Sequence, residues 1–223
     1  MTDLTSRVDA LNELLLSEQS KASAEPLAVA VLDLCEDLLR AGRASTALDV
    51  VEQVMRRRDA LPPETLLKLE ITRVAMLLGA YQYGAAFDSV RKLAVEWEDV
   101  LRRQPKLTDR VQVLQGACLW ASGHHTEAVA VLTRARERLL TEPDSTLLAQ
   151  CGVHLSCAHW ALGEHSMASS IALDALVAAR RAHDRYLESV ALINYAMHMR
   201  RACRWTEAAS ASEAALEILE VLG

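Results

Sequence analysis

The chain has 223 residues, of which 51% are hydrophobic and only 4% aromatic, and it carries a formal net charge of −6. Its apolar residues are mainly Leu, Ala and Val, a mixture that favours closely packed helices over β-sandwiches. The acidic balance and the scarcity of aromatic residues argue against direct nucleic-acid binding, and no apolar run is long enough to cross a membrane. Five cysteines do not make the framework of a small secreted domain, so we expect a cytoplasmic protein.

Residues 1–25 are predicted to form an N-terminal amphipathic helix, because Leu4, Val8, Leu11 and Leu15 recur at helical spacing. The following residues, 26–223, are predicted to form one continuous repeat domain, since no low-complexity linker interrupts them. Apolar residues recur there at intervals of three and four, which predicts helices rather than strands. The expected helices are 3–19, 26–41, 45–59, 64–79, 84–103, 108–122, 125–140, 145–162, 165–182, 185–202 and 206–221.

A pair of small residues five positions apart recurs along the chain, with the first member ending one helix and the second inside the next. The pairs are Gly42 with Ala47, Gly123 with Ala128, Gly163 with Ala168, and Cys203 with Ala208. The last three copies are 40 residues apart, a period that is typical of solenoids. In this register Gly79 is the turn residue of the second repeat, with one or two residues inserted after it.

A second small residue stands seven positions before each turn residue: Cys35, Thr72, Gly116, Ser156 and Ala196. Small residues on two facing helices allow a close crossing, so the pattern predicts helical hairpins with a fixed packing geometry. We therefore expect an all-α fold, a right-handed α-solenoid of about five hairpins behind one N-terminal helix.

The later repeats resemble tetratricopeptide repeats. The resemblance covers roughly residues 27–223 and is carried by the segments LWASGHHTEAVAVLTRARE, HWALGEHSMASSIALDALVAARRAHD and MHMRRACRWTEAASASEAALEILEVLG. The period of about 40 exceeds the usual 34, which implies helices longer by about one turn. Such long repeats are similar to those of bacterial transcription activators, peptide-pheromone receptors and regulators that precede diguanylate cyclase or kinase domains.

The resemblance implies that a peptide or helix binds the concave wall formed by the first helix of each pair. Counted from the turn residues, the predicted partner-binding residues are Leu39, Met76, Val113, Trp120, Val153, His154, Trp160, Ile193, Asn194, Met197 and Arg200. Trp120 and Trp160 stand one repeat apart, as aromatic interface anchors do. In the alternative interpretation, both tryptophans fill the narrow interior of the solenoid or pack on the N-terminal helix.

The sequence predicts no catalytic, cofactor or metal site. It contains no phosphate-binding glycine loop, no His-Glu-x-x-His motif and no nucleophile elbow, so we do not expect an enzyme. Cys151, His154 and Cys157 share one predicted helix, but at ~100° per residue the two cysteines diverge by about 120°. One zinc ion needs converging ligands and would not hold all three. The residues of a chaperone-type carboxylate clamp are also missing.

We therefore expect a scaffold for protein or peptide binding, as the N-terminal regulatory module of a larger bacterial signalling or transcription protein. Two alternatives stay open: a structural module that only dimerises or packs on its own effector, and a small-ligand sensor that uses the concave cavity. Self-association is also expected at the C-terminal edge, unless further repeats follow. The residues expected to form that edge are Val190, Leu192, Ile193, Ala215, Ile218, Leu219 and Leu222.

Overall fold

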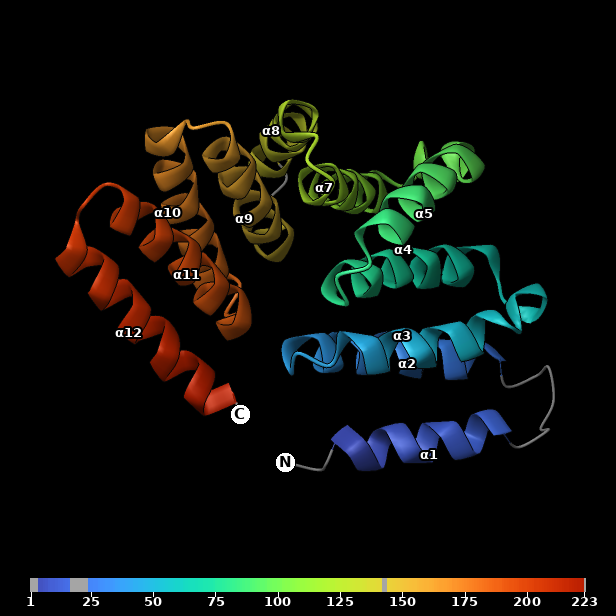
Figure 1. The fold of residues 1–223 in the computed structure, drawn as a ribbon. Helices are drawn as coiled ribbons and strands as arrows, with labels where there is room; N and C mark the ends of the chain where they lie inside the picture. Colours follow the sequence, from blue (N-terminus) through green and yellow to red (C-terminus); the bar gives the residue numbers. More distant parts are fainter. Residues whose placement is uncertain (1–3, 17–23, 142–143, 223) are drawn as a thin grey trace. The chain divides into compact units, whose positions relative to one another are not determined.

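The computed structural model describes residues 4–16, 24–141 and 144–222, and these residues form an all-α helical repeat fold without strands (Figure 1). The chain divides into two compact units, Met1–Val100 (unit 1) and Leu101–Gly223 (unit 2). No described helix is both long enough and apolar enough to cross a bilayer. Residues 3 and 17–19 of the first expected helix, and the side chain of Leu15, lie outside the described residues.

Unit 1 consists of two helical hairpins and a leading helix. The elements are α1 (Leu4–Leu16), α2 (Ala24–Arg40), α3 (Ala44–Met55), the 3-10 turn η2 (Arg58–Ala60), α4 (Pro63–Gly79) and α5 (Tyr83–Glu96). Helices α2 and α3 form the first hairpin, and α4 and α5 form the second. The two hairpins join because α4 packs against both α2 and α3, while α1 packs on the first hairpin.

Unit 2 consists of three further helical hairpins. Its helices are α7 (Pro105–Ala121), α8 (His125–Thr141), α9 (Ser145–Ala161), α10 (His165–Arg181), α11 (Arg185–Arg201) and α12 (Trp205–Leu222). They pair as α7 with α8, α9 with α10 and α11 with α12. Helices α9 and α11 each pack on both helices of the hairpin before them. Each hairpin thus buries its apolar face against its neighbours.

The expected helix 84–103 is wrong as one element, because the structure contains two helices there: α5 and the short α6 (Glu98–Leu101). Helix α5 ends at Glu96 and is capped by Trp97, whose indole Nε1 donates a hydrogen bond of 2.8 Å to the carboxylate of Glu70 on α4. The next helix begins at Pro105, three residues before the expected start. Proline favours the first turn, where its missing N–H is not needed.

The turn inside each hairpin closes on a residue with left-handed backbone. This residue is Gly42, Gly123 or Gly163, with φ of 68°, 84° and 81°, or the non-glycine residue Tyr81 (61°) or Cys203 (58°). Its N–H bonds to the carbonyl three residues earlier, and the next N–H bonds to the carbonyl five residues earlier, as in Gly163 to Trp160 and Glu164 to His159. This pair of bonds is a Schellman cap.

The turn residue of the second repeat is therefore Tyr81, and the assignment of Gly79 is wrong. Gly79 is the last residue of α4, and a Cβ added there would lie 2.9 Å from both Ala44 and Leu39, so its role is close helix packing. With Tyr81, every turn residue is followed five positions later by a buried alanine: Ala47, Ala86, Ala128, Ala168 and Ala208. The residue seven before Tyr81 becomes Val74, so that position is not always small.

Candidate functional site

The first helices of unit 2, α7, α9 and α11, are joined by a connected row of side chains. The rings of Trp120 on α7 and His154 on α9 have centroids 6.3 Å apart. The amide of Asn194 on α11 donates to the sulfur of Cys157 at 3.3 Å. We call the set of Trp120, His154, Cys157, Trp160, Ile193, Asn194, Met197, Arg200 and Arg201 the first-helix face.

The exposed part of the first-helix face lies on α11. Ile193 and Met197 are 40% and 38% exposed, and they are one helical turn apart. Arg200 and Arg201 follow in the next turn and are also exposed. The guanidinium of Arg201 lies 5.5 Å from the centre of the Trp160 ring, close enough for a cation–π interaction. The apolar side chains of Ile193 and Met197, with the adjacent positive charges, are therefore open to solvent.

Several residues that the sequence placed on the wall are buried in the structure. Val113 is 2% and Val153 8% exposed, and Val153 packs in one cluster with Leu176 and Leu192. Asn194 is 7% exposed, and its amide bonds to Cys157. We therefore leave Val113 and Val153 out of the first-helix face, because the following hairpins cover these positions of α7 and α9.

The two predicted wall residues Leu39 and Met76 belong to unit 1, whereas the first-helix face belongs to unit 2. Leu39 is half-buried on α2, where its side chain reaches the space left by Gly79. Met76 is 2% exposed, and the register set by Tyr81 explains its burial. It stands five residues before the turn, at the position of the buried residues Cys118, Ala158 and His198, and Leu78 takes the wall position.

Burial holds three titratable groups in or near the first-helix face neutral: His154, Cys157 and His198. Burial lowers the pKa of His154 to about 4, and burial with the neighbouring His165 lowers the pKa of His198 to about 4. Burial raises the pKa of the Cys157 thiol to about 11, although hydrogen bonds from Ser156 and Asn194 oppose the rise. At pH 7 the face therefore offers aromatic, aliphatic and neutral polar contacts beside two arginines.

The Cys151–His154–Cys157 trio has other structural partners. Cys151 is fully buried and its thiol contacts the carbonyl of Leu132 at 3.3 Å, while Cys157 accepts from Asn194. Within the described ranges, no group of three or more His, Cys, Asp or Glu side chains could hold a metal ion.

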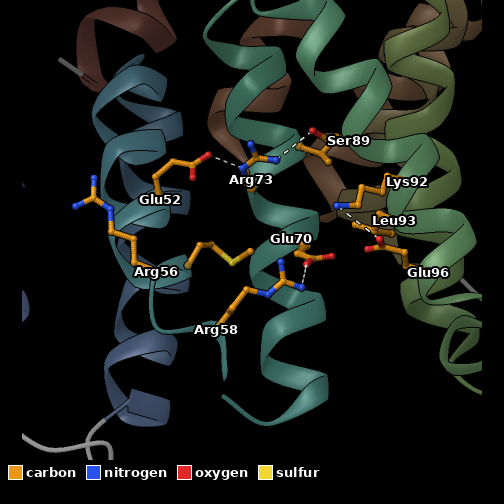
Figure 2. A pocket seen from close by; sticks show the side chains of 11 residues that line it. Glu52, Arg56, Arg58, Glu70, Arg73, Ser89, Lys92, Leu93 and Glu96 are labelled. Carbon is orange, nitrogen blue, oxygen red and sulfur yellow. Dashed lines mark hydrogen bonds and ion pairs between the residues drawn. The ribbon is translucent and has the colours of Figure 1, made fainter. Parts of the chain in front are cut away.

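Unit 1 contains a polar cleft of about 390 Å³ between α3, α4 and α5, which the sequence did not reveal (Figure 2). Arg73 of α4 occupies its centre, donating to Glu52 of α3 at 2.5 Å and to Ser89 of α5 at 3.1 Å. Arg58 lies 3.6 Å from Glu70. The two contacts of Arg73 link α3, α4 and α5, and in each ion pair the opposite charges neutralise each other.

Comparison with known proteins shows the fold of the chain. No protein-family model and no curated protein sequence matches it. Solved structures do match, among them three described below, at identities that establish the fold alone.

A Rap protein complexed with competence and sporulation factor matches with a TM-score of 0.77 and 12% identity, over 96% of this chain and 58% of that one. PlcR of Bacillus thuringiensis, in complex with the peptide PapR7 and DNA, matches with a TM-score of 0.72 and 10% identity, over 87% of this chain and 70% of that one. The TPR-like repeats of a putative kinesin light chain from Podosopora anserina match with a TM-score of 0.57 and 16% identity, over 91% of this chain and 97% of that one. The chain thus has a tetratricopeptide-like fold and spans little more than half of the Rap chain.

Proposed function

We propose that the chain is a protein-interaction scaffold that binds a peptide or helix on the first-helix face of unit 2. The observation that carries the proposal is the exposed pair Ile193 and Met197 beside Arg200 and Arg201. Burial of such apolar side chains lowers the free energy, and here they are exposed on α11, the first helix of its hairpin. Aliphatic side chains next to arginine are common at protein interfaces.

The chemistry of the face indicates what the partner carries. Ile193 and Met197 fit an apolar side chain, and the flexible thioether of Met197 adapts to different shapes. Arg200 and Arg201 fit a carboxylate placed one helical turn away from that side chain. We therefore expect a segment with one or two apolar anchors followed or preceded by Asp or Glu.

The structural neighbours support a regulatory role. The Rap structure contains competence and sporulation factor, and the PlcR structure contains the peptide PapR7. By analogy with these neighbours, which share only the fold, we infer a regulatory module of a larger bacterial signalling or transcription protein, acting in the cytoplasm.

A peptide selection tests the proposal. The whole chain is immobilised and used to select peptides from a random displayed library, and the affinity of the selected peptides is measured by titration calorimetry. We expect peptides that combine apolar and acidic residues, with Kd raised at least about tenfold for the variant Ile193→Ser/Met197→Ser. The control is Met167→Ser on α10, which changes another exposed apolar side chain and should leave Kd unchanged. Equal affinity of the selected peptides for the unchanged chain and both variants would reject the first-helix face as the site.

A further inference from the structure

Helix α12 has two apolar sides. The inner side consists of Ala208, Ala211, Ala215 and Ile218, which are at most 8% exposed and pack toward α11. A second side carries Trp205, Leu216 and Leu219, which are 62%, 56% and 38% exposed. At ~100° per residue these three point within about 60° of one another and roughly 100° away from the inner side. We call Trp205, Ser212, Leu216 and Leu219 the outer flank.

The earlier repeats show what this flank is built to receive. The residues 40 positions before Ser212, Leu216 and Leu219 are Ala172, Leu176 and Ala179 of α10, which are 1%, 6% and 0% exposed. They are buried by the next first helix, α11: Leu176 shares a cluster with Ala191 and Leu192, and Ala179 shares one with Leu187.

The same flank is covered one repeat earlier. On α8, Leu132 and Leu139 occupy the equivalent positions and are 0% and 2% exposed where α9 packs. The outer flank of α12 therefore has the position and apolar character of a helix-docking surface. Among the described residues, no helix covers it, as the exposure of Leu216 and Leu219 shows.

The charges on α12 indicate the chemistry of the helix that would dock. Across α10 and α11, Arg180 donates to Glu188 at 2.8 Å. The residue 40 positions after Arg180 is Glu220, so the charge at this position of the flank is reversed on α12. Glu213, Glu217 and Glu220 follow one another at helical spacing along the border of the outer flank, and α12 contains no Lys, Arg or His.

A second copy of the chain fits this border poorly when the two α12 helices pair in antiparallel orientation. In an antiparallel pair of α12 helices related by a two-fold axis, the two glutamate rows would lie on the same side and repel each other. We propose that the outer flank binds an amphipathic helix of a partner protein, which buries Leu216 and Leu219 and presents Lys or Arg where α11 presents Glu188. The outer flank adjoins Ile193 of the first-helix face, because Val153 and Leu176, the residues 40 positions before Ile193 and Leu216, share one cluster. The proposal rests on α12 alone and does not depend on the function proposed above.

Two peptides that copy α11 test the proposal. Both span residues 184–202 and carry a fluorescent label; one has the natural sequence and the other has Glu188→Lys. Fluorescence anisotropy with the whole chain should show about fivefold tighter binding of the Glu188→Lys peptide, as expected for replacing a like-charge contact by an ion pair. The preference should shrink at 0.5 M salt. In the chain variant Glu220→Lys the preference should invert, with the natural peptide binding more tightly.

Further variants separate docking from folding and from self-association. Leu216→Ser/Leu219→Ser should weaken binding of the Glu188→Lys peptide at least about tenfold, while its circular dichroism stays unchanged because both residues are exposed. Leu173→Ser, which alters an exposed leucine of α10, should bind normally. Equal affinity for the two peptides, or no inversion in Glu220→Lys, would overturn the proposal. So would a dimer in sedimentation that Leu216→Ser/Leu219→Ser dissociates, since a second copy would then cover the flank.

Discussion

His198 breaks the rule that buried polar groups are hydrogen-bonded. The residue is 1% exposed on α11, and both nitrogens of its ring are buried without a hydrogen-bond partner among the described residues. The same position in the three preceding repeats holds Met76, Cys118 and Ala158, all buried and without a charged form at neutral pH. An unsatisfied buried group costs about 1–3 kcal/mol, so His198 reduces the stability of the hairpin that contains it.

Replacing His198 by methionine, the residue that Met76 places at the same position of the second repeat, should stabilise the protein. His198→Met has a similar volume and removes two unsatisfied nitrogens, so we expect the free energy of unfolding to rise by about 1–2 kcal/mol in urea titrations at pH 7.5. The reciprocal variant Met76→His is the matched control and should lower it by a similar amount or more. A loss of stability in His198→Met would show that the imidazole nitrogens are satisfied.

At the scale of single elements, the hairpin turns could be predicted where glycine marked them, or where the 40-residue period did, as at Cys203, 40 residues after Gly163. Gly42, Gly123 and Gly163 were found because glycine is the usual left-handed residue at a helix end. Tyr81 gave no such signal, since an L-residue at φ of 61° costs about 1–2 kcal/mol in this conformation. Gly79, two residues away, gave a false signal, and Met76 was therefore assigned to the wall although it is buried.

The register set by Tyr81 predicts opposite effects at two neighbouring positions. Tyr81→Gly should raise the free energy of unfolding by roughly 0.5–1 kcal/mol, because glycine relieves the left-handed strain and Tyr81 is 79% exposed. Gly79→Ala should lower it by roughly 1–3 kcal/mol, because its Cβ would lie 2.9 Å from Ala44 and Leu39. Thermal and urea unfolding measure both. The reverse pair of signs would restore Gly79 as the turn residue.

The helices themselves could be predicted from apolar spacing, but which of their faces stays open could not. Val153 and Ile193 occupy the same repeat position, and both were expected on the wall. Val153 is buried at 8% exposure, whereas Ile193 is 40% exposed. The difference comes from how many hairpins pack after each helix, which a periodic sequence does not encode locally. The same reason explains the C-terminal edge: Leu192, Ala215 and Ile218 are buried, while Trp205 and Leu216, which were not expected there, are exposed.

For the whole molecule, the histidines are distributed unequally between the two units. All seven histidines lie between residues 124 and 198, within unit 2, and unit 1 has none. Two of them, His154 and His198, have a pKa of about 4 because burial disfavours the charged ring, against an ordinary value of 6.5. In the unfolded chain these rings take up protons near pH 6.5, but in the folded unit they resist protonation until about pH 4.

Mild acid should therefore loosen unit 2 before unit 1. A histidine with a lowered folded pKa favours folding fully above pH 6.5, and this stability is lost as pH falls from 6.5 toward 4, by at most roughly 3 kcal/mol for His198 at 1.36 kcal/mol per pKa unit. Hydrogen exchange at pH 7.5 and 5.0, corrected for intrinsic rates, should show protection falling in α9–α12 and persisting in α2–α5. His198→Met should lose less protection between the two pH values. Equal losses in both units, or an unchanged response in His198→Met, would assign the acid sensitivity to carboxylates instead.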